Sequence, residues 1–259
     1  MKLNNVLVTY IKENNGTLAK VKNILKKINI NYKDVVREKL KVSDFKNKDL
    51  IIVIGGDGTF LKAALFIKDK TPVLGVNSNK AKKEGFFMKA NTKDFEVKLK
   101  KIIKNKYKIA KLTRLQAYIN NKPIKDLALN EFYIGCKKPY DVFRYWIKVN
   151  NKKELQKSSG VLVSTAAGSN AWVTSAGGKK IPIKSTNFQF IVREPYHGTI
   201  TNKYRLLKGI LNRNRFVTII PEIKDCIIVA DSTSIEYKLK KYDKVRISIS
   251  NKPLRFIYF

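Results

Sequence analysis

The chain has 259 residues, of which 44% are hydrophobic, which is enough apolar material for one large domain or two small ones and excludes a disordered chain. It carries 54 Lys and Arg against 20 Asp and Glu, a net charge of +34, which would attract nucleic acids or small anions such as nucleotides. No apolar run approaches the roughly 20 residues that span a bilayer, so we expect no membrane partner.

The first part of the chain alternates predicted strands with predicted helices. Short apolar runs, typical of buried parallel strands, are found at 5–10, 49–54 and 72–77. Helical spacing of apolar residues predicts helices at 16–28, 60–67 and 92–105. Thr92 is the expected N-cap of the last helix. This alternation predicts a parallel sheet covered by helices.

From about residue 106 the pattern changes to short strands separated by turn residues. Such strands are predicted at 118–120, 128–134, 145–149, 160–164, 188–192, 227–230 and 245–249. We therefore predict an α/β fold in which an N-terminal Rossmann-like α/β domain, residues 1–106, precedes a β-rich sandwich domain, residues 107–259. The final strand could return to the N-terminal domain.

Cysteine, histidine and the N-terminus offer little chemistry. Cys136 and Cys226 are too few for a disulfide framework and have no ligand at zinc spacing, so we expect them to be small buried residues. His197 is the only histidine, and its neighbours do not indicate a Ser-His-Asp or Cys-His mechanism. The N-terminus has no signal- or transit-peptide pattern, which predicts a cytoplasmic protein.

A glycine-rich loop follows the second predicted strand and has the sequence Gly55-Gly56-Asp57-Gly58-Thr59. Glycines allow the backbone N–H groups to approach an anion, and the helix that follows adds its N-terminal dipole. The carboxylate of Asp57 could accept a proton from a hydroxyl or help to hold magnesium. An ordinary turn with Asp57 as N-cap is the alternative. The loop also occurs in phosphofructokinases and in diacylglycerol and sphingosine kinases, so it does not name a substrate.

A second stretch, residues 157–178, is rich in small and hydroxylated side chains. An apolar strand leads into it, and Trp172 lies within it. Small side chains leave room for a flat ring and a sugar, and the hydroxyls offer hydrogen bonds. A loop selected only for flexibility would explain the glycines and serines, but not the apolar strand or the tryptophan.

Taken together, these stretches resemble the NAD kinase family. That family carries a Gly-Gly-Asp-Gly loop, an Asn-Glu pair after a strand and a Ser-Thr-x-x-Gly-Ser loop. The same order is found here at 55–58, Asn130-Glu131 and 164–169. The resemblance covers nearly the whole chain, whereas phosphofructokinases and lipid kinases share only the first of the three. It implies a kinase that transfers a phosphoryl group from ATP to the 2′-hydroxyl of the adenosine ribose of NAD or NADH.

Within the family, the chain resembles the branch that contains plant NADH kinases and animal mitochondrial NAD kinases. The segments that carry this resemblance are 157–160, 166–169, 175–178 and 192–195. Common bacterial members have Asp in place of Ser159, and Thr-Ala-Tyr in place of Asn170-Ala171-Trp172. Contacts made by that Asp are therefore not carried over to this chain.

The family resemblance implies a role for each matching residue. Asp57 would be the general base for the ribose 2′-hydroxyl, a poor nucleophile until a carboxylate takes its proton. The residues that would bind the phosphates are Gly55, Gly56, Gly58 and Thr59. Asn130 and Glu131 would hold the dinucleotide through its ribose and base.

The adenine contacts come from two further regions of the sequence. Phe86 matches an aromatic residue that lies against the adenine in relatives, although a core position is an equal alternative. The residues that would line the adenine pocket are Thr165, Ala171 and Ser175. Trp172 could stack on a ring.

The expected partners are small molecules and a second copy of the chain. ATP with magnesium or another divalent cation is the expected donor, polyphosphate stays open, and we assign no protein metal ligand. The branch tends toward dimers, so we expect a homodimer. The lysines form no basic arm, which fits a compositional bias better than nucleic-acid binding. The sequence does not separate NAD from NADH.

Two other classes of protein remain as alternatives. The first is a lipid kinase of the diacylglycerol or sphingosine type, which should lack the Asn-Glu pair and the adenine loop. The second is a basic nucleic-acid-binding protein on a retired kinase fold, against which the intact Asp57, Asn130 and Glu131 argue.

Overall fold

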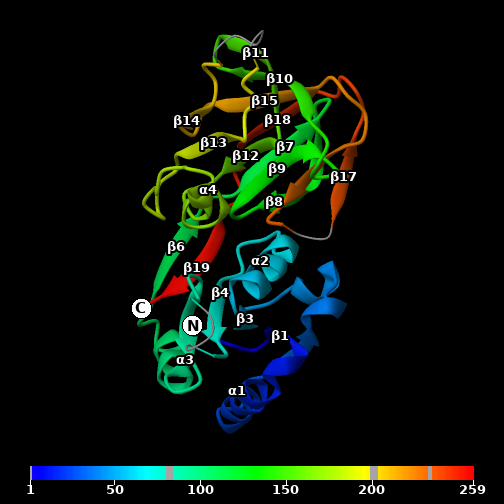
Figure 1. Cartoon of the computed structure of the whole chain (residues 1–259). Coiled ribbons are helices and arrows are strands. Elements are labelled where there is room, and N and C mark those ends of the chain that lie inside the picture. The colour runs from blue at the N-terminus through cyan, green and yellow to red at the C-terminus, as the bar shows by residue number, and fades with distance from the viewer. Residues whose placement is uncertain (1, 80–83, 199–203, 233–234) are drawn as a thin grey trace. The chain divides into compact units, whose positions relative to one another are not determined.

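The computed structural model describes residues 2–79, 84–198, 204–232 and 235–259 (Figure 1). Contacts between residues divide the chain into two compact units. The first comprises residues 1–111 and 254–259, and the second comprises residues 112–253. Within the described residues, none of the helices has the length and apolar character needed to cross a membrane.

The first unit is built on a seven-stranded sheet. Its strands are β1 (Val6–Tyr10), β2 (Tyr32–Val36), β3 (Leu50–Gly55), β4 (Val73–Asn77), β5 (Met88–Asn91), β6 (Lys108–Leu112) and β19 (Leu254–Tyr258). The order is β2-β1-β3-β4-β19-β6, and β5 also pairs with β4. The pairs from β2 through β4 are parallel, as are β4–β5 and β4–β19. The chain's last strand therefore completes the sheet that its first strand begins.

Three helices pack on this sheet, and strand alternation decides which face each one covers. They are α1 (Asn15–Lys27), α2 (Asp57–Phe66) and α3 (Phe95–Ile103). One face of β1, β3 and β4 forms a single apolar cluster with α1 and α3, to which α2 contributes no residue. The α2 residue Phe60 instead stacks on Phe87, with ring centroids 4.8 Å apart. This is the predicted arrangement of a parallel sheet covered by helices.

The second unit contains two six-stranded sheets. One has the order β11-β10-β15-β18-β7-β8, and the other has the order β14-β13-β12-β9-β16-β17. The strands of the first sheet are β7 (Leu115–Ile119), β8 (Lys122–Ala128), β10 (Phe143–Val149), β11 (Lys152–Ser158), β15 (Phe216–Pro221) and β18 (Val245–Ile249). Those of the second are β9 (Glu131–Cys136), β12 (Gly160–Ser164), β13 (Phe188–Arg193), β14 (Lys208–Leu211), β16 (Cys226–Ala230) and β17 (Glu236–Leu239).

Neighbouring strands in both of these sheets are antiparallel. Alternate residues of β10 are buried, as expected for a strand with one face toward a core, whereas β12 is buried along its whole length. The predicted fold class, an α/β unit followed by a β-rich unit, is confirmed. The remaining elements are α4 (Trp172–Ser175) and the 3₁₀ turns Lys12–Asn14, Arg37–Lys39, Val42–Phe45 and Gly168–Asn170.

Two elements differ from the expectation. The N-cap of α3 is Asp94, and the assignment of Thr92 to that position was wrong. The Asp94 carboxylate accepts the Asn91 N–H at 2.7 Å, which closes a turn over the residues where the helix was expected to start. The strand predicted over 128–134 is interrupted at residues 129 and 130, where β8 has ended and β9 has not begun.

Candidate functional site

The glycine loop joins a central parallel strand to a helix. β3 ends at Gly55, α2 begins at Asp57, and Gly56 is the N-cap. The first amides of α2 and its dipole therefore face the loop, as an anion site requires. A Cβ atom at Gly55 would lie 2.6 Å from Oγ1 of Thr59, so only glycine fits there. Thr59 is buried beneath the loop, whereas Gly58 is exposed.

The carboxylate of Asp57 is held by the backbone of a segment about thirty residues away. Its Oδ2 accepts the N–H of Phe86 at 2.9 Å, and its Oδ1 accepts the N–H of Phe87 at 2.8 Å. The side chain is half-buried. Each oxygen of a carboxylate can accept more than one hydrogen bond, so Asp57 is oriented and still able to accept a proton or contact a cation. The structure thus brings together two residues that the sequence predicted separately, Asp57 and Phe86.

The ring of Phe86 is half-buried, and that of Phe87 is buried. The two rings meet edge to face with centroids 5.0 Å apart. The ammonium group of Lys89 lies 5.8 Å from the centroid of the Phe86 ring. Phe87 therefore belongs to the core, and Phe86 keeps part of its ring available for a ligand.

In the second unit, Asn130 and Glu131 lie where β8 gives way to β9, and their exposed fractions are only 6% and 4%. Oδ1 of Asn130 and Oε2 of Glu131 are buried and have no hydrogen-bond partner among the described residues. Burial, together with the charge of Asp231, raises the pKa of Glu131 to about 8. Unpaired buried oxygens are costly, and two of them on consecutive residues are consistent with a site whose partners come from a ligand.

The loop after β12 fastens the backbone of this Asn-Glu pair. Thr165 donates its hydroxyl to the Leu129 carbonyl at 2.6 Å and its N–H to the Asn130 carbonyl at 2.8 Å. A Cβ atom at Gly168 would lie 2.2 Å from the Asn130 carbonyl oxygen, so the loop can approach only because residue 168 is glycine. The structure therefore brings together Thr165, Asn130 and Glu131, all of them predicted site residues.

The remaining predicted residues follow on α4 and its N-terminal flank. Trp172 is half-buried, its ring centroid lies 5.4 Å from that of Tyr133, and the guanidinium carbon of Arg193 lies 4.8 Å from the Trp172 ring centroid. This places a cation on the indole face and a second aromatic ring beside it. Ala171 is half-buried and Ser175 is exposed. Both are open to a ligand approaching from solvent.

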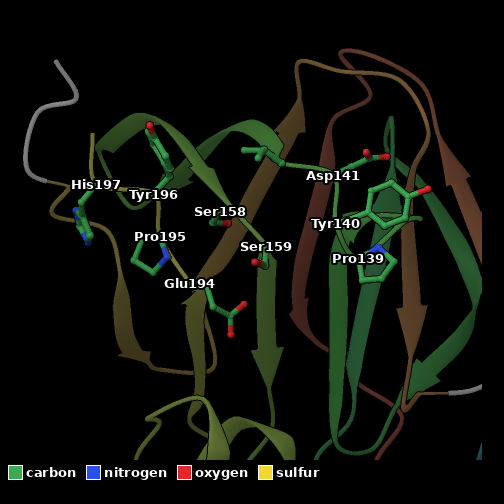
Figure 2. Close-up of a pocket in the computed structure, with 10 residues that line it drawn as sticks. Pro139, Tyr140, Asp141, Ser158, Ser159, Glu194, Pro195, Tyr196 and His197 are labelled. Atoms are coloured by element: carbon green, nitrogen blue, oxygen red, sulfur yellow. The ribbon is translucent and has the colours of Figure 1, made fainter. Parts of the chain in front are cut away.

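The second unit contains a cavity of about 470 Å³. Figure 2 shows the residues that line it, to which the sequence assigned no site role. Ser158 and Ser159 lie between Pro139–Asp141 and a segment that includes Glu194 and His197. Three short segments separated in the sequence build this pocket, and two of them overlap the segments 157–160 and 192–195 that carry the branch resemblance. Ser159 is also the position at which the chain departs from bacterial members of the resembled family.

Among the described residues, the cysteines and possible metal ligands do not form a second functional site. Cys136 and Cys226 face each other in the register of β9 and β16, and both are buried and free, as predicted. Burial raises the pKa of both thiols, that of Cys226 to about 12. Across the described ranges, there is no group of three or more His, Cys, Asp or Glu residues that could hold a metal ion.

Comparison with known proteins gives consistent matches along the chain. Residues 3–107 match the model of the ATP-NAD kinase N-terminal domain, and residues 105–259 match that of the ATP-NAD kinase C-terminal domain. A protein of Oryza sativa subsp. japonica described as a probable NADH kinase is 27% identical over 268 residues, which cover 95% of this chain and 82% of the relative.

Two solved structures share the fold. The NAD kinase from Archaeoglobus fulgidus in complex with ATP has a TM-score of 0.80 and 23% identity, and the match covers 98% of this chain and 93% of that one. Yeast NADH kinase complexed with NADH has a TM-score of 0.82 and 17% identity, with coverage of 100% and 84%.

Proposed function

The chain belongs to the NAD kinase family, and we infer that it transfers the γ-phosphoryl group of ATP to the 2′-hydroxyl of the adenosine ribose of NAD or NADH. The product is NADP or NADPH. The observation that carries this conclusion is the match of both family domains, in order, over residues 3–107 and 105–259. The lipid-kinase and nucleic-acid-binding alternatives are not favoured, because neither accounts for the match of the second domain.

We propose that Asp57 is the general base of this reaction. In the transfer, a bond forms between the ribose 2′-oxygen and the γ-phosphorus of ATP, the bond from that phosphorus to the bridging oxygen breaks, and ADP leaves. The proton of the 2′-hydroxyl passes to the Asp57 carboxylate as the new bond forms. The two backbone hydrogen bonds from Phe86 and Phe87 support this role, because they fix the carboxylate's orientation before substrate arrives.

The glycine loop is the proposed phosphate site. The residues concerned are Gly55, Gly56, Gly58 and Thr59. The support comes from the start of α2 at this loop, since unpaired N–H groups and the helix dipole both favour phosphate oxygens. The side chain of Thr59 is buried against Gly55, and its N–H donates to the Gly56 carbonyl at 3.0 Å, so Thr59 would contribute by fixing the shape of the loop.

Asn130 and Glu131 are the proposed contacts to the dinucleotide's ribose and base. A carboxylate suits two ribose hydroxyls, and an amide can both donate and accept. The buried, unpaired Oδ1 and Oε2 atoms support this, because a bound hydroxyl or amine would satisfy them. The proposed adenine contacts are Phe86, Thr165, Ala171, Trp172 and Ser175.

ATP is the phosphate donor, and we propose that magnesium or another divalent cation accompanies it. Such a cation is usually held by substrate phosphates and one or two carboxylates, and it would neutralise charge on the transferred group. Holding this cation is the alternative to the base role of Asp57, whose carboxylate is oriented and half-buried. Polyphosphate remains a second proposed donor, which the charge of +34 would attract.

We also propose three features of the protein that lie outside the active site. They are the homodimer, the cytoplasmic location and the expected domain limits of 1–106 and 107–259. The branch resemblance supports the homodimer, and fractionation of cells that express the protein tests the location. Because the final strand, β19, pairs with β4 of the first domain, separate expression of residues 107–253 tests whether the second domain folds alone.

The proposed function is tested by incubating the purified protein with ATP, magnesium and either NAD or NADH. An NADP-specific dehydrogenase then measures the product. We expect NADP or NADPH to accumulate only when ATP is present, and no phosphorylation of diacylglycerol or sphingosine. Phosphorylation of a lipid in place of the dinucleotide would support the alternative kinase. Absence of phosphorylated dinucleotide with either ATP or polyphosphate would refute the proposal.

A further inference from the structure

Asp231, directly after β16, makes an unusual set of bonds to the Asn130-Glu131 segment. Its Oδ2 accepts the N–H of Leu129 at 2.7 Å. Its Oδ1 accepts the N–H of Asn130 at 2.6 Å and that of Glu131 at 3.2 Å. Its own N–H donates to the Glu131 carbonyl at 2.9 Å. One buried side chain thus binds three consecutive backbone amides about one hundred residues away in sequence.

These bonds explain why the strand predicted over 128–134 is interrupted. At residues 129 and 130 the backbone N–H groups bond to Asp231 instead of a neighbouring strand. The carbonyls of the same two residues bond to Thr165, and that of Asn130 also accepts the Ser164 hydroxyl at 3.1 Å. The backbone N–H and carbonyl groups of residues 129 and 130 are therefore all hydrogen-bonded without the side chains of Asn130 and Glu131. The side-chain oxygens Oδ1 and Oε2 of these two residues stay unpaired within the described part of the chain.

We propose that Asp231 is a positioning residue for the dinucleotide site: it fixes the Leu129–Glu131 backbone so that the oxygens of Asn130 and Glu131 remain available to the ligand. This rests on the proposed function, in which those two side chains bind the dinucleotide. Asp231 itself is 5% exposed and contacts no substrate in this account.

Burial next to a second acid supports the assignment. Burial raises the pKa of Asp231, and the charge of Asp231 raises the pKa of Glu131. An ionised carboxylate therefore costs free energy at this place, and a neutral residue would serve better if only packing were needed. The three amides and the charge of Arg114, which is fully buried, oppose that rise and favour the ionised carboxylate. A carboxylate suits this position because a single neutral side chain does not accept hydrogen bonds from three backbone amides with comparable geometry.

The test is Asp231→Asn in the full chain, with Asp126→Asn as its matched control. Asp126 is also buried in the second unit, where its carboxylate accepts the Tyr237 hydroxyl at 3.0 Å, a bond that does not involve residues 129–131. Three quantities are measured: the KM for dinucleotide, the KM for ATP, and the Kd for NADH from its fluorescence without ATP. The Kd does not require turnover.

For Asp231→Asn we expect the dinucleotide KM and the NADH Kd to rise about tenfold or more, with the KM for ATP within about twofold of the parent. Asp126→Asn should leave all three nearly unchanged. A dinucleotide KM and NADH Kd that stay at parental values in folded Asp231→Asn would overturn the proposal. If the parent binds NADH but makes no NADPH, the proposed function fails, and the Kd comparison still decides the role of Asp231.

Asp231→Asn could also fail to fold, and a milder variant covers that case. Ser164→Ala removes one hydroxyl, which donates to the Asn130 carbonyl at 3.1 Å and to the Thr165 carbonyl at 3.2 Å, and leaves the bonds from Asp231 in place. It should raise the NADH Kd by severalfold while circular dichroism stays native. An unchanged Kd would show that the position of this backbone does not control dinucleotide binding, and the proposal would then be wrong.

Discussion

Replacing Glu131 with Gln should make the ligand-free protein more stable at alkaline pH and worse at binding its dinucleotide. Glu131 is 4% exposed, and its Oε2 has no hydrogen-bond partner within the described part of the chain. Burial raises the pKa of its carboxyl from the ordinary 4.5 to about 8. Gln has nearly the same shape and cannot ionise, so the variant removes the buried charge and little else.

The sign and size of the effect follow from proton linkage. Between pH 4.5 and about 8 the folded protein holds a proton on Glu131 that the unfolded chain has lost, so this group lowers the free energy of unfolding as pH rises through that window. A shift of this size corresponds to on the order of 5 kcal/mol above pH 8, at about 1.4 kcal/mol per unit. An unpaired Gln amide costs about 1–3 kcal/mol in return. We expect a net gain of about 2–4 kcal/mol at pH 9 and no gain at pH 4.5.

Urea denaturation at several pH values, followed by tryptophan fluorescence, measures this directly. Both tryptophans of the chain, Trp146 and Trp172, lie in the unit that contains Glu131. Glu236→Gln is the control, because Glu236 is exposed and makes only a surface ion pair with Lys137. Stability of Glu131→Gln that matches the parent at pH 9 would refute the buried-charge reasoning. Unchanged dinucleotide affinity at pH 9 would refute the binding role, because the ionised carboxylate offers two acceptor oxygens to the ribose hydroxyls and Gln offers one.

Three further predictions concern the adenine loop and the assembly. Ala171→Leu should raise the dinucleotide KM with little effect on folding, because Ala171 is half-buried; unfolding with intact binding in the surviving fraction would mean that it is a core residue. Gly168→Ala should cost about 1–3 kcal/mol of stability, since its Cβ would meet the Asn130 carbonyl at 2.2 Å. Gly16 lies in α1, where an added Cβ atom would meet open space, so Gly16→Ala should raise the free energy of unfolding by about 0.5–1 kcal/mol. Equal denaturation midpoints for Gly168→Ala and Gly16→Ala would contradict both expectations. The homodimer should strengthen with salt, which screens the charge of +34, and light scattering that shows a monomer at every salt concentration would refute it.

The elements that could be predicted from sequence are those with a strong local signal. β3 is continuously apolar and fully buried, and the glycine-rich sequence at its end marks the turn into α2. β2 was not predicted, because it pairs with β1 alone at the sheet's edge and its residues are half-buried or exposed, which leaves no apolar period. The order in which distant strands pair, such as β19 beside β4, is set by tertiary packing and has no local signature.

The same distinction between local sequence signals and tertiary contacts applies to the candidate site. Asp57 and the Asn130-Glu131 pair could be identified from short motifs, whereas the groups that hold them could not. The amides that orient Asp57 belong to Phe86 and Phe87, and any residue type except proline could supply them. Asp231 follows an ordinary buried strand and has no motif around it, so only the folded chain reveals its bonds to residues 129–131.

The most direct test of the mechanism follows the γ-phosphoryl group itself. Radiolabelled [γ-³²P]ATP is mixed with the parent protein or with Asp57→Asn, at saturating NAD or NADH and magnesium, and the label in the dinucleotide is measured over time. Asp69→Asn is the matched control, because Asp69 is an exposed carboxylate in the same unit that also accepts a backbone N–H, from Thr71 at 2.9 Å. We expect label at the 2′-position with the parent and the control, and a rate about 10²- to 10⁴-fold slower with Asp57→Asn, the usual contribution of a positioned general base. Near-parental transfer by Asp57→Asn, or no label in the dinucleotide with the parent, would contradict the account.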